Sequence, residues 1–438
     1  MTDVVTNVLR FVALQLQKSN DRKRSAALLT AARRLVAQQL GPGTRLQARG
    51  DIVRSATFRC SLEGAGPGVP ASVFLKAGKP AQGRREFDPS DGNAQGSAYR
   101  LFNSWAGLRF LAGLCGEGGV SPRWVAGDRD LGFMLMEDAG ETSVEEVLLG
   151  ADAGAAERGL LDMARAVGRI HAASRGQRET YEAIRFALGP RGDEREVWGT
   201  GPWLRIMVDK LRANLENVGF TAEESFYAEL AGTVRALGEP GPFLVYTHND
   251  LCPDNVRLRA QGAVLIDFEH GGFRHAMTDG AYVRMLFPTC WRVNRVPPSV
   301  VSRMEDAYRA ELVRGCPEAA DDRTFRKALG HGCAYWLAVT LAFAFEKPGS
   351  RYDRTSALEK DQPWGLASLR EIVLGRIEAF LESAEELDVY PRTYETCLRL
   401  KDHLARVWGP GDGVPLFPAF RGSADYAAAT PLNAHSAV

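Results

Sequence analysis

The sequence predicts an α+β protein in which a small antiparallel-sheet part is followed by a larger, mostly helical part. Short segments rich in β-branched and aromatic residues, separated by Gly and Pro, occupy residues 44–138. Stretches with apolar residues at helical spacing begin near residue 142 and continue, with gaps, to about residue 407. The chain has 438 residues, which is too long for one core of ordinary size, so two or three packed units are expected.

The first part opens with a helical pattern over residues 4–40, which the turn formers Gly41-Pro42-Gly43 end. Five strands are predicted after it, and the first three are expected to be antiparallel. A polar, Gly-rich loop covers 80–96, and an amphipathic helix follows from Ser97. The predicted strands are 44–48, 55–62, 71–77, 122–127 and 131–138.

The second part is predicted to be helical, with short strands inserted where polar residues concentrate. Helices are predicted at 144–149, 157–174, 203–218 and 222–237, then from 277 to 287 and onward. Short strands are predicted at 242–248, 255–259 and 263–269. The charged stretch 176–200 has no clear period. The expected organisation is a helical extension (1–43), a first lobe (44–138), a helical lobe (139–408) and a flexible tail (409–438).

Composition argues against several classes of function. The 54 basic and 54 acidic side chains cancel, which argues against a protein that mainly coats nucleic acid or an anionic membrane. The seven cysteines are scattered and form no CxxC pair, so neither a disulfide scaffold nor a zinc site is expected. This use of cysteine makes a reducing cytoplasm the expected location. No signal peptide is expected, and because no uncharged apolar stretch of about 18 residues occurs, no membrane span is expected.

One segment carries a pattern that suits phosphoryl transfer. His248-Asn249-Asp250 is followed five residues later by Asn255 and then by Asp267-Phe268-Glu269, with a predicted hairpin between the two halves. Phosphoryl transfer needs a carboxylate that orients the acceptor hydroxyl and takes its proton, a role that suits Asp250. Magnesium prefers hard oxygen ligands, which Asn255 and Asp267 can supply.

The segment HNDLCPDN followed by IDFE resembles the catalytic motif and metal-binding loop of the aminoglycoside phosphotransferase and choline kinase superfamily. These proteins are relatives of protein kinases that phosphorylate small molecules. The resemblance implies a bilobal, protein kinase-like fold, Mg²⁺, and ATP or GTP as co-substrate. It also implies that Asp250 is the catalytic base, that Asn255 and Asp267 hold magnesium, and that His248 supports the loop.

The resemblance also points to a lysine for the nucleotide phosphates. The family has this residue in a strand that corresponds to the third predicted strand, where Lys76 lies. A lysine in such a strand is costly to bury without a partner. The family pairs the lysine with a helix Glu, but the helix register here puts Ser104 at that position, and the nearest upstream carboxylate is Glu86 in the loop.

Two backbone segments are further candidates for nucleotide contacts. Gly50 and Ser55 lie in the turn between the first two strands, where backbone N–H groups can approach phosphates, although a plain hairpin turn explains the segment nearly as well. Met136, Glu137 and Asp138 lie in MLMEDAG, which resembles the family's hinge, where the backbone meets the adenine. A simple strand end is the alternative for that segment.

Four more positions can be compared with the family. It often has Gly at the position of Asn249 and His at the position of Cys252. By the same resemblance, His171 is expected to be structural, and Asp279 is expected to brace the catalytic loop.

Acceptor specificity in this superfamily is set in the helical lobe and its insertions. Aromatic and acidic residues there suit a cationic amine, although core packing explains any one of them as well. These residues are Trp291, Tyr308, Tyr335, Trp336, Glu305 and Asp306.

The sequence therefore predicts a magnesium-dependent kinase that acts on a hydroxyl group of a small molecule, such as an aminoglycoside-like antibiotic, an amino alcohol or a sugar. Neither nucleic acid nor membrane is an expected partner. Two alternatives stay open: a kinase-like nucleotide-binding protein without activity, which Ser104 in place of the Glu favours, and nucleotidyl transfer on the same fold.

Overall fold

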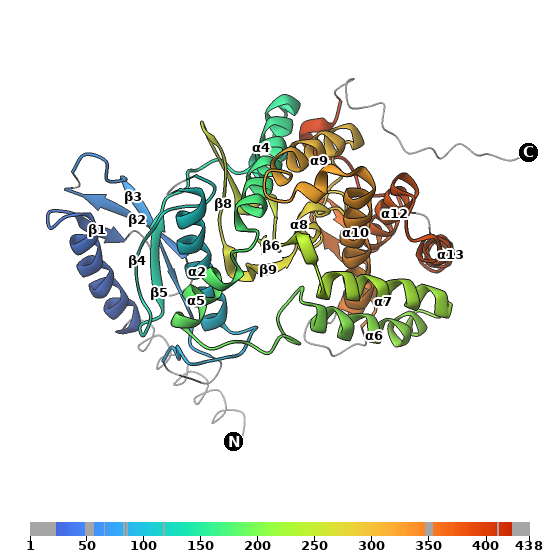
Figure 1. Cartoon of the computed structure of the whole chain (residues 1–438), viewed down its shortest axis with the longest axis horizontal. Helices are drawn as coiled ribbons and strands as arrows, with labels where there is room; N and C mark the ends of the chain where they lie inside the picture. The colour runs from blue at the N-terminus through green and yellow to red at the C-terminus, as the bar shows by residue number, and fades with distance from the viewer. Residues whose placement is uncertain are drawn as a thin grey trace, which may run out of the picture. The chain divides into compact units, whose positions relative to one another are not determined.

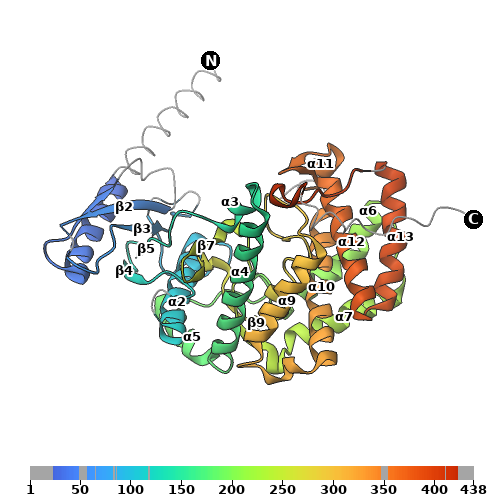
Figure 2. The same cartoon turned by 90° about the horizontal axis from the view of Figure 1, so that it is seen from above.

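The computed structural model forms two compact units and is shown in two orthogonal views in Figures 1 and 2. It describes residues 23–48, 57–64, 66–81, 84, 86–116, 119–346, 354–409 and 411–422. Unit 1 contains the described residues up to Ala139 together with Thr180–Asp193. Unit 2 contains Gly140–Glu179 and the described residues from Glu194 onward.

Unit 1 is built on a five-stranded antiparallel sheet with the strand order β1-β2-β3-β5-β4. Its strands are β1 (Arg45–Ala48), β2 (Thr57–Glu63), β3 (Ser72–Ala77), β4 (Trp124–Asp128) and β5 (Phe133–Glu137). All five predicted strands are confirmed, as is the helix predicted from Ser97, which is α2 (Ser97–Cys115).

A helix at residues 23–40, dark blue in Figure 1, completes the core of unit 1. Leu28, Ala32 and Val36 recur at helical spacing and are buried in one cluster with Val73 and Leu75 of β3. The apolar stripe predicted for the N-terminal segment therefore packs against the sheet. Residues 1–22 of that segment lie outside the described residues.

Unit 1 also takes in most of a helix that the sequence pattern did not predict, α5 (Arg178–Leu188). Its buried residues are Tyr181, Arg185 and Leu188, which form one stripe at helical spacing. Hydropathy did not reveal this stripe, because its central residue is an arginine. The Arg185 guanidinium lies over the ring of Tyr99, 4.5 Å from its centroid, and its Nε donates to Asn103 Oδ1 at 2.5 Å.

Unit 2 is mostly helical, and its helices match the predicted pattern. They are α3 (Val144–Leu149), α4 (Ala153–Ser174), α6 (Gly201–Asn217), α7 (Glu224–Gly238), α8 (Met277–Gly280), α9 (Pro298–Leu312), α10 (Asp322–Ala344), α11 (Arg354–Glu359), α12 (Leu369–Leu387) and α13 (Pro391–Trp408). Helix α10 lies between neighbours and contacts α6, α7, α8 and α12 (Figure 1). It is buried on nearly every side, which is typical of a central helix. Among the described helices, none is both long and apolar enough to cross a membrane.

The predicted helix at 277–287 is only partly correct. Helix α8 ends at Gly280, and the following residues form turns, with Leu286 and Phe287 in the left-handed region at φ 58° and 48°. These residues are buried, so apolar content alone did not distinguish a helix from a buried turn.

Three small antiparallel pairs complete unit 2. They are β6 (Leu244–Thr247) with β9 (Gly272–His275), β7 (Val256–Arg259) with β8 (Gly262–Leu265), and β10 (Pro363–Trp364) with β11 (Ala367–Ser368).

The end of the described chain also packs into unit 2. Phe417 and Phe420 are buried, and the backbone of Arg295 bonds with Pro415 O at 2.9 Å and with the N–H of Phe417 at 3.0 Å. A flexible tail was expected from Gly409, so residues 411–422 differ from that expectation because they bury aromatic side chains. Residues 423–438 lie outside the described residues.

Candidate active site

The two halves of the predicted catalytic segment come together in unit 2. The loop 248–255 follows β6, and the β7–β8 hairpin then returns the chain to Asp267. Val256 pairs with Leu265 at the open end of this hairpin, and the N–H of Ile266 donates to Asn255 O at 2.9 Å. Antiparallel pairing of the hairpin therefore holds the two loops at one edge, as the sequence predicted.

A buried carboxylate braces the first loop. Asp279 accepts hydrogen bonds from the N–H of His248 at 2.7 Å and from the N–H of Asn249 at 2.8 Å. Its Oδ2 also lies 3.2 Å from His171 Nε2, and His171 Nδ1 lies 2.9 Å from the hydroxyl of Tyr308. The expected bracing role of Asp279 and the expected structural role of His171 agree with these contacts.

The electrostatics of the brace favour the ionised carboxylate. Burial alone would raise the pKa of Asp279, but the hydrogen bond from His171, the electrostatic interactions with His171 and His248, and the N–H of His248 together lower it. The Asp279 carboxylate bonds to two successive N–H groups, those of His248 and Asn249. These bonds hold the backbone of Asn249 in the left-handed region at φ 63°.

The imidazole of His248 links the two loops. Its Nδ1 accepts from the N–H of Asp250 at 3.3 Å, so Nε2 carries the proton and donates to Ile266 O at 2.8 Å. The side chain is buried and tied by both nitrogens, which is the geometry of a supporting residue.

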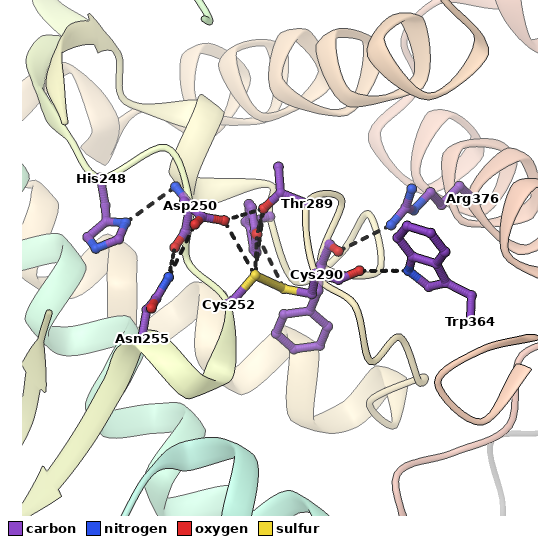
Figure 3. The surroundings of a disulfide bond; sticks show 10 residues. His248, Asp250, Cys252, Asn255, Thr289, Cys290, Trp364 and Arg376 are labelled. Carbon is purple, nitrogen blue, oxygen red and sulfur yellow. Dashed lines mark hydrogen bonds between the residues drawn. A yellow bond between two sulfur atoms is a disulfide. The ribbon is translucent and has the colours of Figure 1, made fainter. Parts of the chain in front are cut away.

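The carboxylate of Asp250 accepts hydrogen bonds on both oxygens (Figure 3). Thr289 Oγ1 donates to Oδ1 at 2.5 Å, and Asn255 Nδ2 donates to Oδ2 at 3.2 Å and to the backbone oxygen at 3.0 Å. The sulfur of Cys252 lies 3.4 Å from Oδ1. Thr289 belongs to no recognisable sequence motif and lies 39 residues from Asp250, so the sequence did not predict its contact with Asp250.

Burial raises the pKa of Asp250 to about 6. The hydrogen bond from Thr289 and the electrostatic interaction with His248 act in the opposite direction, whereas the charges of Asp267 and Glu269 add to the increase. A carboxyl group with its pKa near neutrality is suited to accept a proton during a reaction.

The oxygen atoms beside Asp250 suit a magnesium ion. Because Asn255 directs its amide nitrogen to Asp250, its amide oxygen is the atom left to face a cation. Asp267 adds a half-buried carboxylate on a left-handed residue at φ 63°. One carboxylate and one amide oxygen form the kind of sparse protein ligand set that Mg²⁺ completes with phosphates and water.

A disulfide joins the catalytic loop to a distant turn. Cys252 and Cys290 are bonded across a separation of 38 residues, with their Cα atoms 5.4 Å apart (Figure 3). The cysteine spacing predicted no disulfide scaffold, and it gave no indication of this single bond. Spacing could not show it because the two residues meet only through the tertiary fold.

In unit 1, Lys76 is buried on β3 and its Nζ lies 3.1 Å from Ser104 Oγ of α2. The helix register placed Ser104 at the position of the family's Glu, and the structure brings the two residues together. Glu86 is exposed.

The expected hinge residues end β5. Met136 is buried, Glu137 donates its N–H to Arg123 O at 2.8 Å, and Asp138 accepts from Arg59 Nε at 2.6 Å and Ser72 Oγ at 2.6 Å. Their side chains and part of their backbone are thus engaged within unit 1. Gly50 and Ser55 lie outside the described residues.

Most of the aromatic acceptor candidates belong to the core. Tyr308, Tyr335 and Trp336 are buried, so core packing explains them. Trp291 is 74% exposed and stacks on Trp364 with ring centroids 4.5 Å apart.

Part of the chain matches a known protein family. Residues 106–317, which include both loops, match the model of the phosphotransferase enzyme family. No curated protein sequence matches the chain at a significant level.

Several solved structures are similar at low sequence identity. Choline kinase from Cryptosporidium parvum Iowa II is 12% identical, with 87% of this chain and 99% of that chain covered and a TM-score of 0.43. A choline/ethanolamine kinase family protein from Mesorhizobium loti is 18% identical, with 87% and 99% covered and a TM-score of 0.42. Macrolide 2′-phosphotransferase MphH from Brachybacterium faecium is 14% identical, with 74% and 100% covered and a TM-score of 0.38.

The family match confirms the resemblance that the motif from His248 to Asp267 predicted. Residues 106–317 of this chain therefore resemble a phosphotransferase.

Proposed function

We propose that the protein transfers the γ-phosphate of ATP or GTP to a hydroxyl group of a small molecule, with Asp250 as the catalytic base. The observation that carries the proposal is the carboxylate of Asp250, held by hydrogen bonds on both oxygens and placed beside Asn255. Its pKa near 6 leaves it ionised at neutral pH and still able to accept a proton.

In the proposed reaction the acceptor hydroxyl donates its proton to the carboxylate of Asp250 as its oxygen bonds to the γ-phosphorus. The bond between that phosphorus and the bridging oxygen breaks, and the nucleoside diphosphate leaves. Asn255, through its amide oxygen, and Asp267, through its carboxylate, would hold magnesium, which neutralises phosphate charge when bound. His248 keeps the two loops in register through its bond to Ile266 O.

On the nucleotide side we assign the phosphates to Lys76, whose ammonium is buried on β3. The backbone at Met136, Glu137 and Asp138 is the proposed contact for the nucleotide base. The turn that contains Gly50 and Ser55 is a further proposed phosphate contact. These assignments make residues 44–138 the nucleotide-binding lobe and 139–408 the catalytic lobe.

The acceptor class is proposed as an amino alcohol, an aminoglycoside-like antibiotic or a sugar. The test incubates the protein with MgATP or MgGTP and a panel of choline, ethanolamine, gentamicin and simple sugars, followed by mass spectrometry for an added phosphate. The wild type is expected to phosphorylate one class, and Asp250→Asn is expected to lose at least a hundredfold in rate. Thr396→Val, a buried change in α13 away from the catalytic loops, serves as the matched control.

The same experiment decides between the proposal and its alternatives. Attachment of a nucleotide monophosphate to the acceptor would establish nucleotidyl transfer instead. Magnesium-dependent nucleotide binding with no turnover on any acceptor or water would indicate a silent binding protein. Equal rates for Asp250→Asn and the wild type would remove Asp250 from the role of base.

A further inference from the structure

The turn that contains Thr289 is held in a costly backbone conformation. Leu286 and Phe287 are successive non-glycine residues in the left-handed region, at φ 58° and 48°, and both are buried. Residues with side chains avoid this region, and such strain persists only where surrounding contacts fix it. Strained residues of this kind gather at functional sites, so the turn requires an explanation beyond chain reversal.

Three contacts fix this turn, two on the side of Trp364 and Arg376 and one on the side of Cys252 (Figure 3). Arg376 Nη2 donates to Phe287 O at 3.2 Å from within α12. Trp364 Nε1 donates to Cys290 O at 3.0 Å. The disulfide joins Cys290 to Cys252, two residues after Asp250. Together these contacts leave Pro288 and Thr289, the two residues between Phe287 and Cys290, little freedom relative to the catalytic loop.

The result of this arrangement is the bond from Thr289 to Asp250. An ionised carboxylate can only accept, so the single proton of the Thr289 hydroxyl points to Oδ1 at 2.5 Å. The phenol of Tyr282 also bonds to Thr289 Oγ1, and because the threonine proton is already engaged, Tyr282 is the donor. Tyr282 is fully buried, and burial holds its pKa well above the ordinary value, which keeps the phenol protonated. The direction of the chain Tyr282 to Thr289 to Asp250 is therefore fixed.

We propose that Thr289 is a positioning residue for the base: its hydroxyl fixes the rotation of the Asp250 carboxyl group so that a lone pair of Oδ2 keeps one direction for the acceptor hydroxyl. Asn255 holds Oδ2 from one side at 3.2 Å, and Thr289 holds Oδ1 from the other. A carboxylate held at both oxygens cannot turn about its Cβ–Cγ bond. The inference rests on the proposed function, in which Asp250 is the base.

The test removes the hydroxyl with little change of shape and then restores it. Thr289→Val lacks the donor, and Thr289→Ser keeps it. Tyr282→Phe removes the donor to Thr289 together with the 3.4 Å contacts of the phenol with the sulfurs of Cys252 and Cys290. Thr396→Val makes the same exchange at another buried threonine, whose hydroxyl bonds to Arg392 O at 2.9 Å within α13. Turnover is followed as phosphate released from MgATP with water as acceptor, so the assay does not depend on the identity of the alcohol.

A hydrogen bond to a charged group of this kind corresponds to a loss of roughly 10- to 100-fold in kcat for Thr289→Val. The KM for ATP is expected to stay unchanged, because Thr289 contacts the base and not the nucleotide lobe. Thr289→Ser should recover most of the rate, Tyr282→Phe should give a smaller loss, and Thr396→Val should match the wild type. If the substitutions only impaired folding, the fraction of active protein would fall in both Thr289→Val and Thr396→Val, and Thr289→Ser would not recover the rate.

Crystal structures of the variants give a readout that does not need activity. The proposal expects the Asp250 carboxyl group to adopt a different or a second orientation in Thr289→Val and the wild-type orientation in Thr289→Ser. An unchanged carboxylate in Thr289→Val, or a wild-type kcat, would overturn the positioning role. A wild-type protein that fails to turn over any nucleotide would count against the proposed function, while the carboxylate orientation would still decide the role of Thr289.

Discussion

Replacement of Asp279 by Ala should destabilise the protein far more than removal of an ordinary helix cap. The Asp279 carboxylate accepts from two successive backbone N–H groups, those of His248 and Asn249, at 2.7 and 2.8 Å. Both donors are buried, and each buried donor left without a partner costs about 1–3 kcal/mol. The two losses together predict a decrease of about 2–6 kcal/mol in the free energy of unfolding. His171 loses its contact with the carboxylate as well.

Asp321 provides the matched control for this change. Its carboxylate also accepts a backbone N–H, that of Thr324 at 2.8 Å, but at the exposed N-terminus of α10. Replacement of such a cap by Ala costs about 1 kcal/mol. Urea unfolding can be followed by tryptophan fluorescence, since Trp336 Nε1 donates to Thr278 O beside the brace at 2.7 Å.

The result that would contradict the argument is a midpoint for Asp279→Ala equal to that of Asp321→Ala with the same denaturant slope. The pH dependence supplies a second check. The pKa of Asp279 is lowered in the folded protein, so its stabilisation is present above the unfolded-state pKa of an aspartate and is lost as pH falls through the folded value. The difference between wild type and Asp279→Ala should therefore shrink as the solution becomes more acidic.

Three further predictions concern stability and nucleotide use. Replacement of Cys252 and Cys290 by Ser should lower the free energy of unfolding by about 4 kcal/mol, because the disulfide closes a separation of 38 residues. Equal denaturation midpoints of the wild type with and without reductant would count against a disulfide in solution. Gly332→Ala should destabilise the protein because the new Cβ would lie 2.2 Å from a backbone oxygen of α8. Gly232→Ala in α7 has room for the Cβ and should raise the free energy of unfolding by about 0.5–1 kcal/mol. Thermal unfolding of both variants measures the difference. Lys76→Met should lower kcat/KM for MgATP by roughly 10- to 100-fold in a steady-state assay, and a wild-type value would remove Lys76 from the phosphate site.

The parts of the fold that the sequence predicted are those fixed by short-range patterns. Every strand of unit 1 and most helices of unit 2 follow from apolar spacing and from Gly or Pro at the ends. Helix α5 was not predicted from apolar spacing because its buried stripe contains Arg185. The charge of Arg185 is accommodated by stacking on Tyr99 and by a hydrogen bond to Asn103. A hydropathy pattern counts such an arginine as a surface residue.

The same distinction applies to the site. His248, Asp250 and Asn255 lie in one loop, so their spacing was enough to predict that they act together. For Lys76, the resemblance and the register of α2 indicated that Ser104 lies at the position of the family's Glu, but they did not predict which residue would contact Lys76. Thr289 and the Cys252–Cys290 pair depend on a turn that approaches the loop only after the helices of unit 2 have packed. No local pattern encodes an approach of that kind.

The left-handed backbone of Asn249 changes how the three-residue motif should be compared between relatives. At φ 63° a position accepts glycine without strain and asparagine at small cost, which agrees with the Gly that the resemblance implies for this position. The Asn249 side chain is fully buried, and its Nδ2 faces the backbone oxygen of Trp198 at 3.5 Å. The choice between His-Asn-Asp and His-Gly-Asp thus reflects local chain geometry. An asparagine at this position is therefore evidence for a left-handed turn and not for a particular acceptor.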